Sequence, residues 1–212
     1  MATPSADRGR PAGLTVRRLV TLGDSFTAGT PEVETPWPEH AAAQLGCEVT
    51  NLALFGARSA EVQAGQVGRA IALSPDVVSL ICGANDVLLT TRPDVAAFTA
   101  TYAGMLARLR TELPDAVLVV ATYPHPDARS PLRPRSLARV RTGLREVNDG
   151  IRWLARRHGA VCLELDGHPD AAGANVAADG FHPSQAGHRR LAVAFVERLR
   201  EHLDTGPEED LE

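Results

Sequence analysis

Short apolar runs alternate along this sequence with longer segments of helical periodicity, which is the pattern of repeated βα units. The runs are continuous in Val, Ile and Leu, as expected for parallel strands that are buried on both faces. The segments between them are long enough for crossover helices. We therefore predict an α/β fold with five parallel strands: Leu19–Leu22, Glu48–Leu52, Val77–Ile81, Val117–Thr122 and Val161–Leu165.

Two later segments carry the clearest helical stripes. Apolar residues at spacings of three and four predict one helix over residues 137–154, with Ser136 as its N-cap. A second stripe predicts a final helix that begins after Pro183, uses Ser184 as its cap and ends near Leu203. A chain of 212 residues can bury one substantial core, so we expect a single domain.

The composition excludes several classes of chemistry. All 22 basic residues are arginine, which excludes Schiff-base, P-loop phosphate and Ser-Lys chemistry because each needs an amine. A net charge of -4 and an aromatic content of 4% give no reason to expect nucleic acid as a partner. The excess of Ala, Arg and Gly suggests a bacterial source.

The sequence carries no recognisable targeting segment. Residues 1–13 mix charged residues with prolines and lack an apolar core of signal-peptide length. No apolar run approaches the ~18 residues needed to cross a bilayer, so we expect no membrane span and a cytoplasmic protein. Cys47, Cys82 and Cys162 are odd in number and lie in or beside apolar stretches, which predicts small buried hydrophobic residues rather than a disulfide framework.

Reactive and polar residues stand where the predicted strands end. In an open parallel sheet, ligands bind outside the carboxyl ends of the strands, so residues at those positions are expected to meet. The first strand is followed by Gly23-Asp24-Ser25, the second by Gly56, the third by Gly83-Ala84-Asn85-Asp86 and the fifth by Asp179-Gly180-Phe181-His182-Pro183. A hydroxyl, a flexible glycine, a carboxamide and an Asp/His pair are therefore predicted at one edge of the sheet.

Ser25, His182 and Asp179 together have the chemistry of a nucleophilic triad. A serine hydroxyl attacks a carbonyl only when a base within hydrogen-bond reach accepts its proton, and an imidazole that titrates near pH ~6.5 can do so. Asp179 lies three residues before His182, close enough to orient its ring. For the oxyanion that forms, we predict three donors: the backbone amides of Ser25 and Gly56 and the side-chain amide of Asn85.

This set of motifs resembles the SGNH, or GDSL, hydrolase family of esterases, lipases and acyltransferases. All four name-giving positions, Ser25, Gly56, Asn85 and His182, are present in the family's order. The resemblance implies a three-layer α/β/α sandwich with a flavodoxin-like sheet and the triad and oxyanion roles given above. It runs from about Leu19 to Leu203. A G-x-S-x-G elbow is absent, which argues against an ordinary α/β-hydrolase.

The predicted organisation is one SGNH hydrolase-like catalytic domain over residues 16–204. A disordered segment over residues 1–15 and an acidic disordered tail over residues 205–212 are expected to flank it. The predicted activity is hydrolysis of small-molecule carboxylic esters with small or medium acyl groups, through an acyl-enzyme on Ser25 and without a metal or organic cofactor. Alternatives are an acyltransferase that passes the acyl group to an alcohol or sugar, a metal-dependent hydrolase, and a non-catalytic binding module. The sequence gives no oligomeric state.

Several of these residues have alternative roles. Ser25 has the residue type of a helix cap, while Asn85 and Gly56 have types that serve in turns. An alternative hypothesis is a metal site, because carboxylates and imidazoles that suit divalent ions lie close in sequence: Asp166, His168, Asp170, Asp179 and His182. Cys82 is a thiol near the Asn85 turn, but it lies in an apolar strand without an assigned base. Asp24 and Asp86 are predicted to brace loops through backbone amides, and Trp37 is predicted to lie in the core.

An arginine-rich loop follows the fourth predicted strand. Arg129, Arg133, Arg135, Arg139 and Arg141 crowd this loop and the start of the next helix. Most such side chains are solvated. Since the loop is expected near the sheet edge, Arg129 and Arg133 are nevertheless candidates to bind a carboxylate or phosphate group of a substrate.

Overall fold

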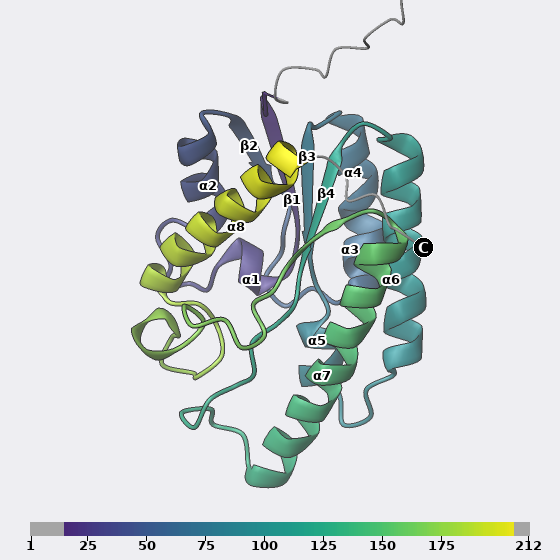
Figure 1. Cartoon of the computed structure of the whole chain (residues 1–212). Coiled ribbons are helices and arrows are strands. Elements are labelled where there is room, and N and C mark those ends of the chain that lie inside the picture. Colours follow the sequence, from purple (N-terminus) through teal and green to yellow (C-terminus); the bar gives the residue numbers. More distant parts are fainter. Residues whose placement is uncertain (1–14, 206–212) are drawn as a thin grey trace, which may run out of the picture.

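One parallel sheet forms the centre of the molecule (Figure 1). The structure is a computed structural model that describes residues 15–205. Its strands lie in the order β2-β1-β3-β4-β5 and are β1 (Arg18–Gly23), β2 (Glu48–Asn51), β3 (Val77–Ile81), β4 (Val117–Ala121) and β5 (Val161–Leu163). The predicted α/β fold with five parallel strands is thus confirmed. Most of the predicted flanking segments, 1–15 and 205–212, lies outside the described residues.

Helices cover both faces of this sheet (Figure 1). On one face pack α2 (Trp37–Leu45) and α8 (Gln185–Thr205), which contact each other. The other face is covered by α3 (Ser59–Gly65), α4 (Val67–Ala72), α6 (Val95–Glu112) and α7 (Pro134–Arg157). Three short helices follow strands or lie in loops: α1 (Ser25–Ala28), α5 (Ala84–Leu88) and the 3-10 turn η1 (Gly173–Asn175).

The core is built from the strands and the apolar stripes that face them. Val20, Leu22 and Leu80 are among its fully buried side chains, and Trp37 is buried against Phe195, as predicted for a core residue. The three cysteines are free thiols; Cys82 is fully buried as predicted, whereas Cys47 and Cys162 are only half-buried. None of the helices between residues 15 and 205 combines the length and apolarity that a membrane crossing requires.

The two helices predicted from apolar stripes have boundaries that differ from the sequence prediction. The long helix α7 begins at Pro134 rather than after Ser136, and its N-cap is Arg133. Proline suits the first helical position because its φ is already helical and it needs no N–H partner there. The cap predicted for the last helix is correct, since Ser184 Oγ accepts a hydrogen bond from the Gly187 amide at 3.2 Å. This helix, α8, extends to Thr205.

The strand β5 is shorter than predicted because a side chain takes over its hydrogen bonds. Thr122 Oγ1 accepts from the backbone amides of Leu165 at 2.9 Å and Asp166 at 3.1 Å. These amides therefore leave the sheet ladder after Leu163. The chain beyond β5 turns away into the long loop that carries Asp179 and His182.

The strand order places a topological switch point between β1 and β3. After β1 the chain crosses to β2 on one side, and after β2 it crosses to β3 on the other side, so the two connections diverge at the carboxyl ends. Gly23, the last residue of β1, lies beside Ile81 of β3. A Cβ atom at Gly23 would lie 2.0 Å from the carbonyl oxygen of Ile81, and the φ angle of Gly23 is +145°. Glycine is therefore required where these strands meet.

Replacing Gly23 with Ala should cost at least ~3 kcal/mol of the free energy of unfolding, because backbone must move as well as adopt a strained φ. Gly46→Ala is a matched control, since Gly46 also has a positive φ, +67°, but an added Cβ would meet no atom within 4 Å. The control should lose only about 1 kcal/mol. Urea unfolding of both variants measures the difference, and equal losses would contradict the steric explanation.

Candidate active site

Ser25 lies just after the carboxyl end of β1, an inner strand between β2 and β3. It is the first residue of α1, and the N-cap of this helix is Asp24, whose side chain accepts from the Phe26 amide at 2.9 Å. Ser25 is therefore not the cap that its residue type allowed. The Ser25 residue is 3% exposed, so very little of it is open to solvent.

A continuous chain of hydrogen bonds links Ser25, His182 and Asp179. The Ser25 hydroxyl oxygen lies 2.8 Å from His182 Nε2, and His182 Nδ1 lies 2.5 Å from Asp179 Oδ2. Because a carboxylate can only accept, Nδ1 carries the proton and donates it, which leaves Nε2 free to accept the hydroxyl proton of Ser25. The structure brings together three side chains that the sequence separates by up to 157 positions.

The loop before His182 holds Asp179 in its ionised form. The second carboxylate oxygen, Oδ1, accepts from the backbone amides of Phe181 at 2.9 Å and His182 at 3.0 Å. Partial burial acts to raise the pKa of Asp179, but the hydrogen bonds from His182 and from these two amides outweigh it and hold the pKa below its ordinary value. Asp179 is thus charged at neutral pH and orients the imidazole.

The three predicted oxyanion donors come from the ends of three neighbouring strands. The amide of Ser25 begins a helix, and the amide of Gly56 lies in a turn; neither has an acceptor among residues 15–205. Asn85 donates one side-chain hydrogen to the Ala57 carbonyl at 3.0 Å and keeps a second hydrogen for another partner. Gly56 has a φ of +78°, and the space where a Cβ would point is open.

Backbone and side-chain contacts tie these strand ends to one another. The Leu54 amide donates to the Gly23 carbonyl at 3.1 Å, which fixes the Gly56 turn beside the Ser25 turn. Asp86 accepts from both the amide and the hydroxyl of Ser59, at 3.0 and 2.6 Å. Asp86 therefore braces a loop through a backbone amide as predicted, and Asp24 does the same through Phe26.

Comparison with known proteins identifies the family. The model of the GDSL-like lipase/acylhydrolase family matches residues 21–190. The chain belongs to this family. It is accordingly an ester-hydrolysing enzyme of the GDSL type, as its sequence motifs predicted. A comparison with curated protein sequences returned no match.

Solved structures of GDSL hydrolases share the fold. A lipase/acylhydrolase from Enterococcus faecalis superposes with a TM-score of 0.71 at 23% identity, covering 91% of this chain and 99% of that one. TesA gives 0.71 at 20% identity, with 87% and 99% covered. A catalytic mutant of the acetylxylan esterase Axe2 from Geobacillus stearothermophilus gives 0.68 at 18% identity, with 86% and 94% covered.

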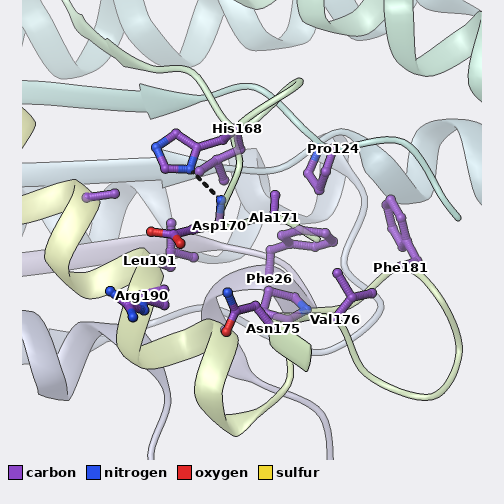
Figure 2. Close-up of a pocket in the computed structure, with 14 residues that line it drawn as sticks. Phe26, Pro124, His168, Asp170, Ala171, Asn175, Val176, Phe181, Arg190 and Leu191 are labelled. Atoms are coloured by element: carbon purple, nitrogen blue, oxygen red, sulfur yellow. Dashed lines mark hydrogen bonds between the residues drawn. The ribbon is translucent and has the colours of Figure 1, made fainter. Parts of the chain in front are cut away.

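Phe26 and Phe181 line an apolar pocket (Figure 2). The rings of Phe26 and Phe181 contact each other at 5.0 Å and both contact the His182 ring. The pocket is enclosed by α8, η1 and the loop after β5, and its lining includes Val176 and Leu191. Phe26 and Phe181 therefore line the pocket and also pack against the imidazole of His182.

The carboxylates and imidazoles of the alternative metal site bind separate partners in the structure. Asp166 pairs with Arg152 at 3.1 Å, and His168 Nδ1 accepts from the Asp170 amide at 3.2 Å. Asp179 and His182 are bonded to each other. Within residues 15–205, no three His, Cys, Asp or Glu side chains are arranged to share a metal ion. Cys82 is a buried core residue, and its complete burial raises the pKa of the thiol well above the ordinary value.

Arg129 braces the loop that carries Asp179 and His182. Its guanidinium pairs with Asp127 and donates to the carbonyls of Gly173 at 3.2 Å and Val176 at 3.3 Å. The Asp127 amide in turn donates to the Gly180 carbonyl at 2.7 Å. Arg133 is exposed at the start of α7. Anion binding by Arg129 or Arg133 stays a prediction.

Two residues of the site were missed by sequence reasoning. Tyr123 follows β4, the one strand whose end offered no recognised motif, and its hydroxyl reaches Asp24 at 2.8 Å. Phe55 precedes Gly56, and its ring stacks on the His182 ring at a centroid distance of 6.1 Å. A search for aromatic residues at every strand end would have found both.

Arg129→Ala should loosen the segment from Gly173 to Gly180, because it removes three contacts that cross the loop. We expect backbone amides there, including that of Gly180, to exchange hydrogen about tenfold faster, as for a local opening that becomes about 1.4 kcal/mol easier. Arg133→Ala is the control and should leave exchange unchanged. Protection that is equal in both variants would show that Arg129 does not brace this loop.

Proposed function

We propose that this GDSL hydrolase cleaves carboxylic esters through an acyl-enzyme on Ser25, with His182 as general base and then acid and Asp179 as the orienting carboxylate. The observation that carries the proposal is the pair of contacts that join Ser25 Oγ to His182 Nε2 and His182 Nδ1 to Asp179. Such a chain supplies the proton acceptor without which a serine hydroxyl is a poor nucleophile.

In the first half-reaction, Ser25 Oγ attacks the ester carbonyl while its proton passes to His182 Nε2. The resulting imidazolium is stabilised by Asp179, and it then protonates the alcohol as the C–O bond breaks. In the second half-reaction, water gives a proton to His182 and attacks the acyl-serine, which releases the acid and restores the Ser25 hydroxyl. Every proton and bond is accounted for by these side chains and water.

The proposed oxyanion site uses the amides of Ser25 and Gly56 and the free hydrogen of Asn85. Within residues 15–205 these three hydrogens have no competing acceptor, and two of them belong to backbone amides that follow the ends of β1 and β2. Donors that are already oriented cost no reorganisation when the charge develops, and losing one typically lowers the rate ~10²–10³-fold.

Labelling with a fluorophosphonate tests the assignment of Ser25. The native enzyme should be labelled and should hydrolyse p-nitrophenyl esters. Ser25→Ala should lose both properties, because no other serine between residues 15 and 205 has a hydroxyl bonded to a histidine. Ser130→Ala is the control: Ser130 lies in the loop that approaches Gly180, and only its hydroxyl is lost. Labelling of Ser25→Ala equal to that of the native enzyme would refute the proposal.

Exposed apolar side chains beside the site support an acyl group longer than acetyl. Leu54 is 59% exposed, Phe55 61% and Leu89 54%. The segments that carry them also carry Gly56 and Asn85, and Arg58 links them by donating to the Leu89 carbonyl at 3.1 Å. An acyl chain lying on these side chains would bury apolar surface on both partners, at about 0.8 kcal/mol for each methylene that leaves water.

Phe55→Ala should therefore lower kcat/KM for a hexanoate ester about tenfold, while kcat/KM for an acetate ester should fall less than about threefold. A series of p-nitrophenyl esters of increasing chain length measures this. Trp153→Ala is the matched control, since Trp153 is also large and 50% exposed but lies on α7 beside Arg157. An equal loss of kcat/KM for the acetate and hexanoate esters would indicate instead that Phe55 acts by packing against the His182 ring.

A further inference from the structure

A buried hydrogen bond joins the carboxyl end of β4 to the residue before the nucleophile. Tyr123 is fully buried, and its hydroxyl donates to Asp24 Oδ2 at 2.8 Å. The other carboxylate oxygen of Asp24 accepts from the Phe26 amide at 2.9 Å. One side chain therefore connects β4 to the residues on both sides of Ser25.

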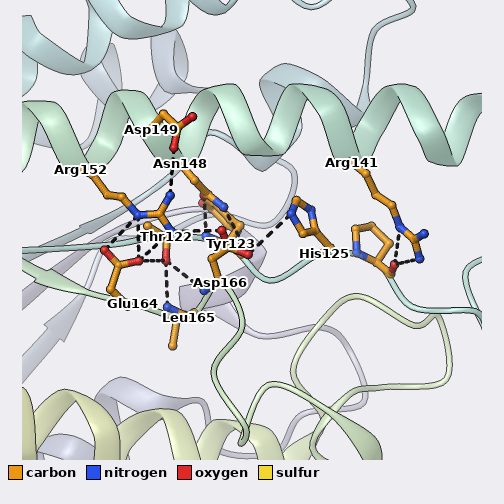
Figure 3. A network of polar contacts seen from close by, with 11 residues as sticks. Thr122, Tyr123, His125, Arg141, Asn148, Asp149, Arg152, Glu164, Leu165 and Asp166 are labelled. Atoms are coloured by element: carbon orange, nitrogen blue, oxygen red, sulfur yellow. Dashed lines mark hydrogen bonds and ion pairs between the residues drawn. The ribbon is translucent and has the colours of Figure 1, made fainter.

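The Tyr123 side chain is itself held in place from α7 (Figure 3). Asn148 is fully buried in this helix and bonds the Tyr123 backbone twice: Oδ1 accepts from its amide at 2.8 Å, and Nδ2 donates to its carbonyl at 2.9 Å. The Tyr123 ring also packs edge-on against Phe26 at 4.9 Å. The phenol is thus fixed relative to the sheet before it reaches Asp24.

The turn that carries Ser25 needs such an external support. The helix α1 has only four residues, and the two backbone bonds that return to the Asp24 carbonyl come from Thr27 and Ala28. A helix this short is marginal without tertiary contacts. The position of the Ser25 hydroxyl relative to His182 consequently depends on how firmly Asp24 is held.

We propose that Asp24 and Tyr123, with Asn148 behind them, are positioning residues that fix the Ser25 turn for catalysis and that turnover depends on the hydrogen bond between Asp24 and Tyr123. The proposal rests on the assignment of Ser25 as the nucleophile. Catalytic groups must be held within about 0.5 Å of their productive geometry, and this hydrogen bond removes a way for the turn to shift.

The ionisation of Asp24 depends on the balance between burial and the hydrogen bonds that it accepts. Burial raises the pKa of Asp24 to about 7, while hydrogen bonds from the Phe26 amide and the Tyr123 hydroxyl act to lower it. The titratable groups that face it are Tyr123, Asp86 from α5, Cys82 after β3 and Tyr102 from α6. Among them, Asp86 acts electrostatically to raise the pKa of Asp24.

Tyr123→Phe tests the proposal, and Tyr102→Phe is a matched control. Both phenols are fully buried and donate one hydrogen bond of 2.8 Å, but the Tyr102 hydroxyl donates to the Leu80 carbonyl in β3 and does not reach the Ser25 turn. The loss of either hydroxyl should lower the melting temperature by a similar amount. Only Tyr123→Phe should lower kcat, by about tenfold or more, with KM within about twofold.

The pH profile gives a readout that a purely structural role would not change. The Tyr123 hydroxyl lowers the pKa of Asp24, so its removal raises that pKa, and Asp24 then becomes protonated at a higher pH. The acid limb of the kcat/KM profile should therefore move to higher pH in Tyr123→Phe and stay in place in Tyr102→Phe. The rate of fluorophosphonate labelling at Ser25 should fall in parallel with kcat.

Equal kcat values for Tyr123→Phe and Tyr102→Phe, or an unmoved acid limb, would overturn the proposal. If Tyr123→Phe fails to fold, Asp24→Asn replaces it as the test, because asparagine is isosteric with aspartate and keeps an oxygen for the Phe26 amide. A native kcat in Asp24→Asn would also overturn the proposal. Ser25→Ala is labelled alongside. Persistent labelling of Ser25→Ala would reject the nucleophile assignment, whereas native labelling of Tyr123→Phe with none of Ser25→Ala would reject only the positioning role.

Discussion

The close approach of β1 and β3 at Gly23 determines where the reactive groups of this enzyme can lie. Gly23 packs against the Ile81 carbonyl, and the Asp24 amide donates to the same oxygen at 3.1 Å. The Ser25 turn therefore starts directly beside the end of β3, from which Asn85 projects. Since sheet backbone is among the least mobile parts of a protein, the spacing between Ser25 and Asn85 is set mainly by the ends of β1 and β3.

His182, the proposed base, is positioned by a loop rather than by the end of a strand. His182 lies 157 residues after Ser25, in the loop between β5 and α8, and the contacts that hold this loop include the Asp127 amide and the Arg129 guanidinium. Phe26 and Phe181 pack around the imidazole. The site thus combines a rigid half, formed by strand ends, with a half carried by a loop whose order comes from side-chain contacts.

The sequence contained enough information to predict the sheet and to single out Ser25, His182 and Asp179, which the structure joins by hydrogen bonds. Parallel strands buried on both faces leave uninterrupted apolar runs, and Ser25, Asn85 and His182 stand in short motifs that follow such runs. Boundaries were less predictable because they depend on contacts between distant residues. Thr122 draws the Leu165 amide away from the ladder and ends β5 early. The cap predicted at Ser136 was wrong because Pro134 already starts the helix.

Tyr123 could not be predicted for the same reason, since its partners Asp24 and Asn148 lie 99 and 25 positions away and only the folded sheet brings them together. Asp24 also raises an energetic question, because a cap made by Ser or Asn would satisfy the Phe26 amide without burying a carboxyl group. A carboxylate, however, has acceptor capacity for several donors at once, here from α1 and from the end of β4. The cost of its desolvation is offset only while those donors stay in place, so the charge of Asp24 and the geometry of the nucleophile turn are coupled.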